Sequence, residues 1–119
     1  MQLNHIDLPV PDVAAATAFF VDGFGFTLAE QRGKDGMAIL TSPGMVLVLT
    51  RAAEAVYPAS FHIGFLQASA EAVHAAHARL LAAGIAVPEA PKTMRGSLLF
   101  YCHAPGGVLV EVSCRGALP

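Results

Sequence analysis

Two histidines and a glutamate stand in three separate apolar segments, and together they could bind a divalent metal ion. His5, His62 and Glu111 are each flanked by Val, Leu, Ile or Phe in segments that are typical of β-strands. Two imidazoles and a carboxylate are the donor set of a three-ligand divalent metal site. A carboxylate in such an apolar strand must pair with another group, because an unpaired buried charge is costly. Each residue taken alone also fits an ordinary hydrogen-bonded histidine or a solvent-facing glutamate.

An internal repeat relates these residues. His5-Ile6 opens one apolar segment and His62-Ile63 opens another, and each is followed by a loop, an Ala-rich helical segment and a Gly-containing stretch. A single repeat of this kind often cannot bury its apolar face alone. If the two units pair, their opening strands come together, and the two histidines converge by pseudo-symmetry.

Hydrophobic periodicity and turn residues predict a βαβββ order in each half of the chain. Asp12 and Ser69 are the predicted N-caps of the two helices. We expect one domain over 1–119, made of units 1–50 and 61–114 joined by the linker 51–60. The predicted elements are strands 2–8, 26–31, 37–41 and 45–50 with helix 13–21, then strands 61–66, 85–88, 97–103 and 108–114 with helix 70–83, and a loop at 89–96.

Strand alternation assigns the chemically active side chains to one face. His5 shares a face with Asp7, His62 shares one with Gly64, and Glu111 faces away from the larger aliphatic residues of its strand. The aliphatic side chains take the opposite face, under the helices. The sequence therefore predicts an α+β fold whose mixed sheet packs on helices with one face and curves around a cavity with the other.

Composition narrows the class of protein and its partners. The chain has 119 residues, of which 55% are hydrophobic and 13% charged, with a formal net charge of −2. Such a chain is not disordered, and without a basic run it is not expected to bind nucleic acid. It has no apolar run long enough to span a membrane and no signal peptide, so we expect a cytoplasmic protein. Because the chain is small and strongly apolar, we expect it to bury apolar surface in a homodimer.

Two cysteines do not form a disulfide framework in a chain of this kind. Cys102 and Cys114 lie on neighbouring predicted strands, and Cys114 faces away from Glu111 by alternation. We expect two reduced, buried thiols that fill the core.

Several short motifs together resemble one known family. They are Asn4-His5-Ile6 with Val10-Pro11-Asp12, Ala18-Phe19-Phe20 leading to Gly23-Phe24-Gly25-Phe26, Phe61-His62-Ile63, and the closing segment from Pro105-Gly106-Gly107 to Glu111-Val112. Over its whole length the chain resembles the vicinal oxygen chelate superfamily, also called the glyoxalase, bleomycin-resistance and extradiol-dioxygenase family. The resemblance implies paired βαβββ units in a cupped mixed sheet. It also implies one divalent metal ion (Fe, Mn, Zn, Ni or Co) held by His5, His62 and Glu111.

The chain departs from the family pattern at two places. Some members add a fourth metal ligand, a Glu on the fourth strand, whose place here is taken by Val48. A three-ligand site leaves coordination positions open, as in the family's dioxygenases and fosfomycin-modifying thiol transferases. The closing turn, usually Asp-Pro-Asp-Gly, begins at His103 and lacks the Asp.

The resemblance also implies roles for residues around the metal. A Tyr at the place of Tyr101 lies near metal-bound substrate in relatives, although a core tyrosine with its hydroxyl at the rim fits the sequence equally well. Asp7 is a candidate general base or a support for the ligands, and its alternative is a carboxylate in water at a strand end.

Four further residues are candidates for substrate binding. Lys92 and Arg95 could bind an anionic substrate, or could simply be solvated charges of the loop. His103 reaches either the cavity or its rim, and Val48 is an expected wall residue.

Two classes of function remain after this reasoning. The first is a metal-dependent enzyme acting on a small oxygenated substrate chelated to the ion, as a lyase, isomerase, transferase or dioxygenase. The alternative is a metal-free, bleomycin-resistance-like protein that binds a drug or another small ligand. The full His5, His62 and Glu111 set favours the enzyme. In relatives the metal site is often shared between two chains, and both arrangements remain open here.

Overall fold

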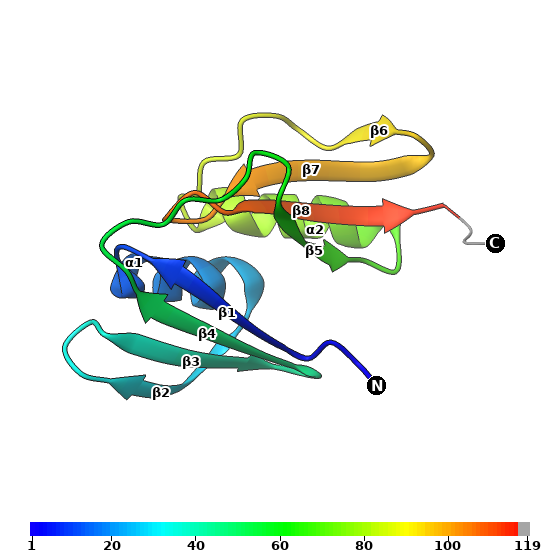
Figure 1. Ribbon diagram of the computed structural model, residues 1–119. Helices are drawn as coiled ribbons and strands as arrows, with labels where there is room; N and C mark the ends of the chain where they lie inside the picture. The colour runs from blue at the N-terminus through cyan, green and yellow to red at the C-terminus, as the bar shows by residue number, and fades with distance from the viewer. Residues whose placement is uncertain (117–119) are drawn as a thin grey trace. The chain divides into compact units, whose positions relative to one another are not determined.

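The computed structural model describes residues 1–116, and these form two compact units with the same order of elements (Figure 1). The first unit comprises Met1–Val56 with Pro105–Gly107, and the second comprises Tyr57–Ala104 with residues 108–116. The division between Val56 and Tyr57 falls inside the predicted linker. That the chain forms a single domain stays a prediction.

Both units contain a four-stranded mixed sheet with matching topology. The strand orders are β1-β4-β3-β2 and β5-β8-β7-β6, and in each sheet the first pair is parallel and the others antiparallel. The predicted α+β class and the two βαβββ units are confirmed. The elements are β1 (His5–Val10), α1 (Val13–Ala18), the π-helical turn η1 (Phe19–Gly23), β2 (Thr27–Arg32), β3 (Met37–Ser42), β4 (Met45–Arg51), β5 (His62–Leu66), α2 (Ala70–Ala82), β6 (Lys92–Met94), β7 (Ser97–His103) and β8 (Leu109–Arg115).

The helices begin where their capping residues predict. The Asp12 carboxylate accepts a hydrogen bond from the Ala15 amide at 2.9 Å, and the Ser69 hydroxyl accepts one from the Ala72 amide at 3.1 Å. Asp35, in the β2–β3 turn, accepts from the Ala14 amide at 2.8 Å and so ties that turn to the start of α1.

Each unit buries the aliphatic face of its sheet under its own helix. α1 packs on β3 and β4, and α2 packs on β7 and β8. Alternation along the strands explains which side chains are buried, since every second residue points to the helix. The buried set includes Leu8, Val10, Val13, Phe20, Leu40 and Leu49 in the first unit, and Val73, Leu80, Phe100, Val110 and Val112 in the second.

The sixth strand is displaced from its predicted position. We expected a strand at 85–88 followed by a loop at 89–96, but β6 runs over Lys92–Met94 within that segment. β6 pairs with β7 through a tight turn in which Arg95 has a φ of 52° and Gly96 a φ of 78°. Two positive φ values favour a two-residue hairpin, and this turn fixes the strand next to it.

The two cysteines differ in burial. Cys102 is buried, and this burial raises its thiol pKa to about 11. Cys114 is half-buried, so the prediction of two buried, core-filling thiols holds only for Cys102. Both thiols are free, as expected.

The outer strand β2 carries a β-bulge. Leu28 pairs with Leu40 and Glu30 with Ile39, so one extra residue of β2 is left between these pairs. Glu30 and Arg32 form an exposed ion pair at 2.7 Å on the same strand. β2 is exposed along its whole length.

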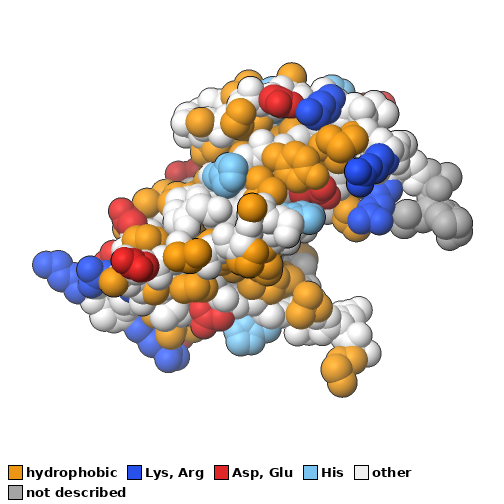
Figure 2. Space-filling model, turned by 45° about the horizontal axis from the view of Figure 1, so that its top comes forward, with side chains coloured by type: hydrophobic (Ala, Val, Ile, Leu, Met, Phe, Trp, Pro, Cys, Tyr) orange, Lys and Arg blue, Asp and Glu red, His pale blue; other side chains and the backbone are white. Residues whose placement is uncertain are grey.

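Surface character is mixed in the described part of the chain. On the face shown in Figure 2, acidic and basic side chains are interspersed with apolar ones. Within residues 1–116, none of the helices has the length and apolarity needed to cross a membrane.

Adjacent leucines on α2 test this account of the second core. Leu80 is fully buried, whereas Leu81 is 52% exposed. We expect Leu80→Ala to lower the free energy of unfolding by about 2–5 kcal/mol, through lost burial and the cavity left behind. Leu81→Ala, the matched control, should change it by no more than about 0.5 kcal/mol. Urea denaturation followed by circular dichroism measures both, and equal losses would contradict the assignment of α2's buried face.

Candidate functional site

Glu111 lies on a central strand of the second sheet, and its carboxylate accepts hydrogen bonds from two hydroxyl groups. It is in register with Gly64 on β5 and with Tyr101 on β7, so these three positions share a face of the sheet. The Tyr101 hydroxyl donates to Oε1 at 2.7 Å, and the Ser113 hydroxyl donates to Oε2 at 3.1 Å. The carboxylate is therefore held in place from both sides.

The charge of Glu111 lacks an ion-pair partner among residues 1–116. The ion pairs in that part of the chain are Glu30–Arg32 and Glu89–Lys92. Glu111 is half-buried, and neutral hydroxyls compensate such a carboxylate only in part. Each carboxylate oxygen can accept more than one bond, so both retain capacity for a cation.

Tyr101 is a protonated donor at neutral pH. Its hydrogen bond to Glu111 is the main cause that raises its pKa, and burial and the negative charge of Glu111 raise it further. The positive charge of Arg95 lowers the Tyr101 pKa, but by less than these effects raise it.

His62 presents one ring nitrogen with a free lone pair. Its Nδ1 lies 2.9 Å from the Ser60 carbonyl oxygen, which can only accept, so Nδ1 carries the proton. Nε2 is then the nitrogen available to a metal, in the arrangement that metal-binding histidines commonly use. The imidazole also packs edge-on against Tyr101, with 6.4 Å between ring centroids.

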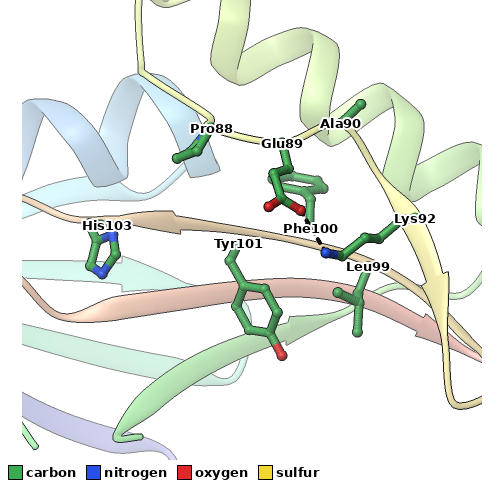
Figure 3. Close-up of a pocket in the computed structure, with 8 residues that line it drawn as sticks. All are labelled: Pro88, Glu89, Ala90, Lys92, Leu99, Phe100, Tyr101 and His103. Atoms are coloured by element: carbon green, nitrogen blue, oxygen red, sulfur yellow. Dashed lines mark hydrogen bonds and ion pairs between the residues drawn. The ribbon is translucent and has the colours of Figure 1, made fainter. Parts of the chain in front are cut away.

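A pocket of about 180 Å³ adjoins this group (Figure 3). Tyr101 connects the pocket with Glu111, because it lines the pocket and its hydroxyl donates a hydrogen bond to the Glu111 carboxylate. Lys92 and His103 line the pocket, whereas Arg95 lies outside it in the β6–β7 turn. That any of the three binds substrate stays a prediction. The lining residues are Pro88, Glu89, Ala90, Lys92, Leu99, Phe100, Tyr101 and His103.

The polar end of the pocket contains an ion pair. The Lys92 ammonium lies 2.6 Å from Oε2 of Glu89, and both side chains are more than half exposed. An exposed pair of this kind contributes little to stability, so an incoming anion could replace Glu89 at little cost.

The first unit holds the remaining predicted residues. His5 and Asp7 share a face of β1, in register with Val46 and Val48 on β4. The Asp7 carboxylate accepts a hydrogen bond from the Thr50 hydroxyl at 2.8 Å. Val48 is buried. His5 lines an open hollow together with residues of β3, β4 and the N-terminal segment.

The donor chemistry of His62 and Glu111 fits a divalent ion, and these two residues belong to one unit. Within residues 1–116, no group of three His, Cys, Asp or Glu side chains is placed to hold a metal. His5, the third predicted ligand, belongs to the first unit. Its assignment as a ligand, like that of the other two, stays a prediction.

Three polar side chains of these groups were not predicted to take part. Ser113 lies on β8 with Glu111, and Thr50 lies on β4. The contact of Thr50 with Asp7 depends on cross-strand register, which local sequence does not reveal, whereas Ser113 and Glu111 lie two residues apart on one strand. Glu89 lies three residues before Lys92, and that spacing was a usable signal for their ion pair.

Comparison with known proteins gives consistent matches over the chain. The family model described as Glyoxalase/Bleomycin resistance protein/Dioxygenase superfamily matches residues 2–112. The structure of a possible glyoxalase from Bacillus cereus is 39% identical, with a TM-score of 0.83, and the match covers 96% of this chain and 99% of that one. No curated protein gives a match.

More distant structures share the fold. A glyoxalase/bleomycin resistance protein/dioxygenase from Nocardioides is 22% identical with a TM-score of 0.80, covering 100% of this chain and 90% of that one. A lactoylglutathione lyase from Agrobacterium tumefaciens is 22% identical with a TM-score of 0.76, covering 95% and 92%.

Tyrosine titration tests the Tyr101–Glu111 hydrogen bond. In metal-free protein carrying Tyr57→Phe, the only tyrosinate absorbance comes from Tyr101, since the chain has 2 tyrosines. We expect a midpoint above the ordinary value of about 10 and a fall toward it in Glu111→Gln, because the charged acceptor is removed. Glu89→Gln is the control and should leave the midpoint unchanged.

The raised pKa of Tyr101 makes the stability of the folded protein depend on pH. The folded pKa of Tyr101 is raised, so the stabilisation by this bond is present below about pH 10 and is lost as pH rises through the folded pKa. In the tyrosine titration described above, an unchanged Tyr101 midpoint in Glu111→Gln would contradict the hydrogen bond between Tyr101 and Glu111.

Proposed function

This chain belongs to the Glyoxalase/Bleomycin resistance protein/Dioxygenase superfamily, and from that premise we propose that it is a metal-dependent enzyme acting on a small oxygenated substrate. One observation carries the proposal. Glu111 is a half-buried carboxylate without an ion-pair partner among the described residues, held by two hydroxyls beside a histidine whose Nε2 is free. A divalent cation supplies the charge that this carboxylate lacks.

The proposed ligands are His5, His62 and Glu111. Two imidazoles and one carboxylate suit Fe(II), Mn(II), Zn(II), Ni(II) or Co(II), and leave coordination positions for substrate oxygens. His62 and Glu111 come from the second unit. His5 comes from the first unit, either of the same chain or of a second copy.

A divalent ion bound there supplies Lewis-acid stabilisation of negative charge on a substrate oxygen. The chain's own groups position the reactants. Tyr101 fixes the Glu111 carboxylate and holds a proton on its hydroxyl at neutral pH, at the boundary between that carboxylate and the pocket. It is therefore a proposed catalytic residue, whose single hydroxyl proton would pass from the hydrogen bond with Glu111 to a substrate oxygen when that carboxylate binds the ion instead.

The pocket beside Tyr101 is the proposed substrate site. Its walls are mostly apolar, from Leu99, Phe100 and Pro88, and its polar groups are Lys92, Glu89, His103 and the tyrosine. At about 180 Å³ it is smaller than the roughly 300 Å³ at which drug-sized sites begin, which supports a small substrate. Lys92 is the proposed contact for an anionic group on that substrate.

Metal analysis of single variants tests the proposal. Protein purified without chelator should contain about one transition metal ion per chain. His62→Ala and Glu111→Ala should lose it, because each removes a proposed ligand. His74→Ala, which changes an exposed histidine of α2, is the matched control and should retain it. Circular dichroism of each variant separates loss of metal from loss of fold.

A protein that takes up no Fe(II), Mn(II), Zn(II), Ni(II) or Co(II) would contradict the metal site. The apolar pocket would then favour the alternative, a metal-free protein that sequesters a drug or small ligand. Ligand screening by thermal shift would test that function.

We also propose that the protein is a homodimer. The high apolar fraction of the chain favours an assembly that hides surface. Sedimentation equilibrium should return twice the chain mass of 12.4 kDa at micromolar concentration. The chain mass itself would contradict the proposal.

A further inference from the structure

The strand β7 is paired along the whole of one edge but only along part of the other. On one side it pairs with β8 from Ser97 to His103. On the other side it pairs with β6 only from Ser97 to Leu99. Within residues 1–116, the outer edge of β7 from Phe100 to His103 therefore has no strand beside it.

The hydrogen bonds to β8 show which backbone groups point to this outer edge. The Ala104 amide donates to the Val108 carbonyl at 3.0 Å, and the Gly116 amide donates to the Gly96 carbonyl at 3.2 Å. Antiparallel strands bond at alternate residue pairs, so the even-numbered residues of β7 bond to β8. The amide and carbonyl groups of the odd-numbered residues point to the other side.

Tyr101 and His103 are the odd-numbered residues of β7 beyond the end of β6. On their outer side, neither residue has a backbone hydrogen bond within residues 1–116. The pocket is lined by this part of β7 and, across from it, by Pro88, Glu89 and Ala90 (Figure 3). The pocket therefore lies where a further strand would pair with β7.

The segment before β6 does not fill this position itself. Continuing the β6–β7 register would place Ala90 opposite Tyr101 and Pro88 opposite His103. Proline has no amide hydrogen, so Pro88 could not donate to the His103 carbonyl, and a proline inside a sheet is tolerated only at its edge. The segment borders a pocket of about 180 Å³ instead of pairing, and the backbone groups of β7 remain available to a ligand.

A cation stands at one end of this unpaired edge. Lys92 is the first residue of β6 and lines the pocket, and its ammonium lies 2.6 Å from the Glu89 carboxylate. Because both side chains are more than half exposed, a carboxylate of a ligand can replace that of Glu89. The pocket thus offers a partner for a carboxylate next to a donor and an acceptor for an amide.

We propose that this pocket binds an N-acylated amino acid. The proposal names the ligand class of the substrate site and so rests on the proposed function. The amide N–H of the ligand donates to the Tyr101 carbonyl, as a neighbouring strand would. The ligand carboxylate accepts hydrogen bonds from the Tyr101 amide and the Lys92 ammonium, and displaces Glu89. A volume of about 180 Å³ favours a single residue over a longer peptide.

Titration of isotope-labelled protein with N-acetyl-L-alanine, followed by NMR, tests the proposal. The backbone amide resonance of Tyr101 should shift, and the shift gives the affinity. O-acetyl-L-lactate is the matched probe, because an ester oxygen replaces the amide N–H in a molecule of the same shape. It should bind at least about fivefold more weakly, since it cannot donate to the Tyr101 carbonyl. Equal affinity for the two probes would overturn the proposal.

Three variants test the contact with the ligand carboxylate. Lys92→Met should weaken N-acetyl-L-alanine binding at least about tenfold, because it removes a charge-assisted hydrogen bond. Glu89→Gln should strengthen binding about threefold, because the internal competitor loses its charge. Lys34→Met, which removes the same charge from an exposed turn of the first unit, is the matched control and should stay within about twofold of wild type. Unchanged affinity in Lys92→Met would also overturn the proposal.

Hydrogen exchange of the ligand-free protein tests the unpaired edge directly. The Cys102 amide bonds to β8, whereas the Tyr101 amide points to the pocket, so Tyr101 should exchange at least about tenfold faster. Saturating N-acetyl-L-alanine should slow the exchange of Tyr101 and leave that of Cys102 unchanged. Equal protection of the two amides in the free protein would show that the edge is already paired, against the proposal.

The ligand class and the proposed function fail in different ways. If the protein holds one metal ion per chain but N-acetyl-L-alanine shifts no resonance of the pocket residues, the ligand class is overturned and the metal-dependent function stands. If the probe binds as described and the protein takes up no metal, the ligand class stands and the metal-dependent function is overturned.

Discussion

The register of β8 between its two neighbours is the constraint on which the second unit depends. β8 pairs in parallel with β5 and antiparallel with β7, and this pairing aligns Gly64, Glu111 and Tyr101 across the sheet. Because side chains alternate along a strand, a slip of one residue would turn Glu111 toward α2 and Val112 away from it. The cost of burying that carboxylate and exposing the valine holds the register in place. The sheet that forms the core therefore also positions the candidate site.

Much of the site follows from rules that act within a few residues. His5, His62 and Glu111 were predicted as ligands because polar residues are conspicuous in apolar strands, and alternation alone assigned Asp7 and Glu111 to their faces. Asp12 and Ser69 predicted the starts of both helices, since capping is local chemistry. The βαβββ order followed from periodicity and turns.

Other features depend on interactions between distant parts of the chain, and sequence reasoning missed them. β6 was misplaced because a three-residue strand has no periodicity to detect, and only its pairing with β7 defines it. The hydrogen bond from Thr50 to Asp7 joins residues far apart in sequence, so it became visible only with the register of β1 and β4. The pocket likewise combines the segment from Pro88 to Lys92 with one strand, and local patterns predict neither its size nor its lining.

The bulge in β2 has a consequence for how the protein behaves in a crowded solution. An exposed outer strand offers unpaired amides and carbonyls that can template addition of a strand from another molecule. The extra residue between Leu28 and Glu30 breaks the regular spacing of those groups, and the Glu30–Arg32 pair puts charges of both signs along them. This edge is therefore poorly suited to growing a continuous sheet between molecules. Association through it, including the kind that leads to aggregation and fibrils, is disfavoured by the backbone itself.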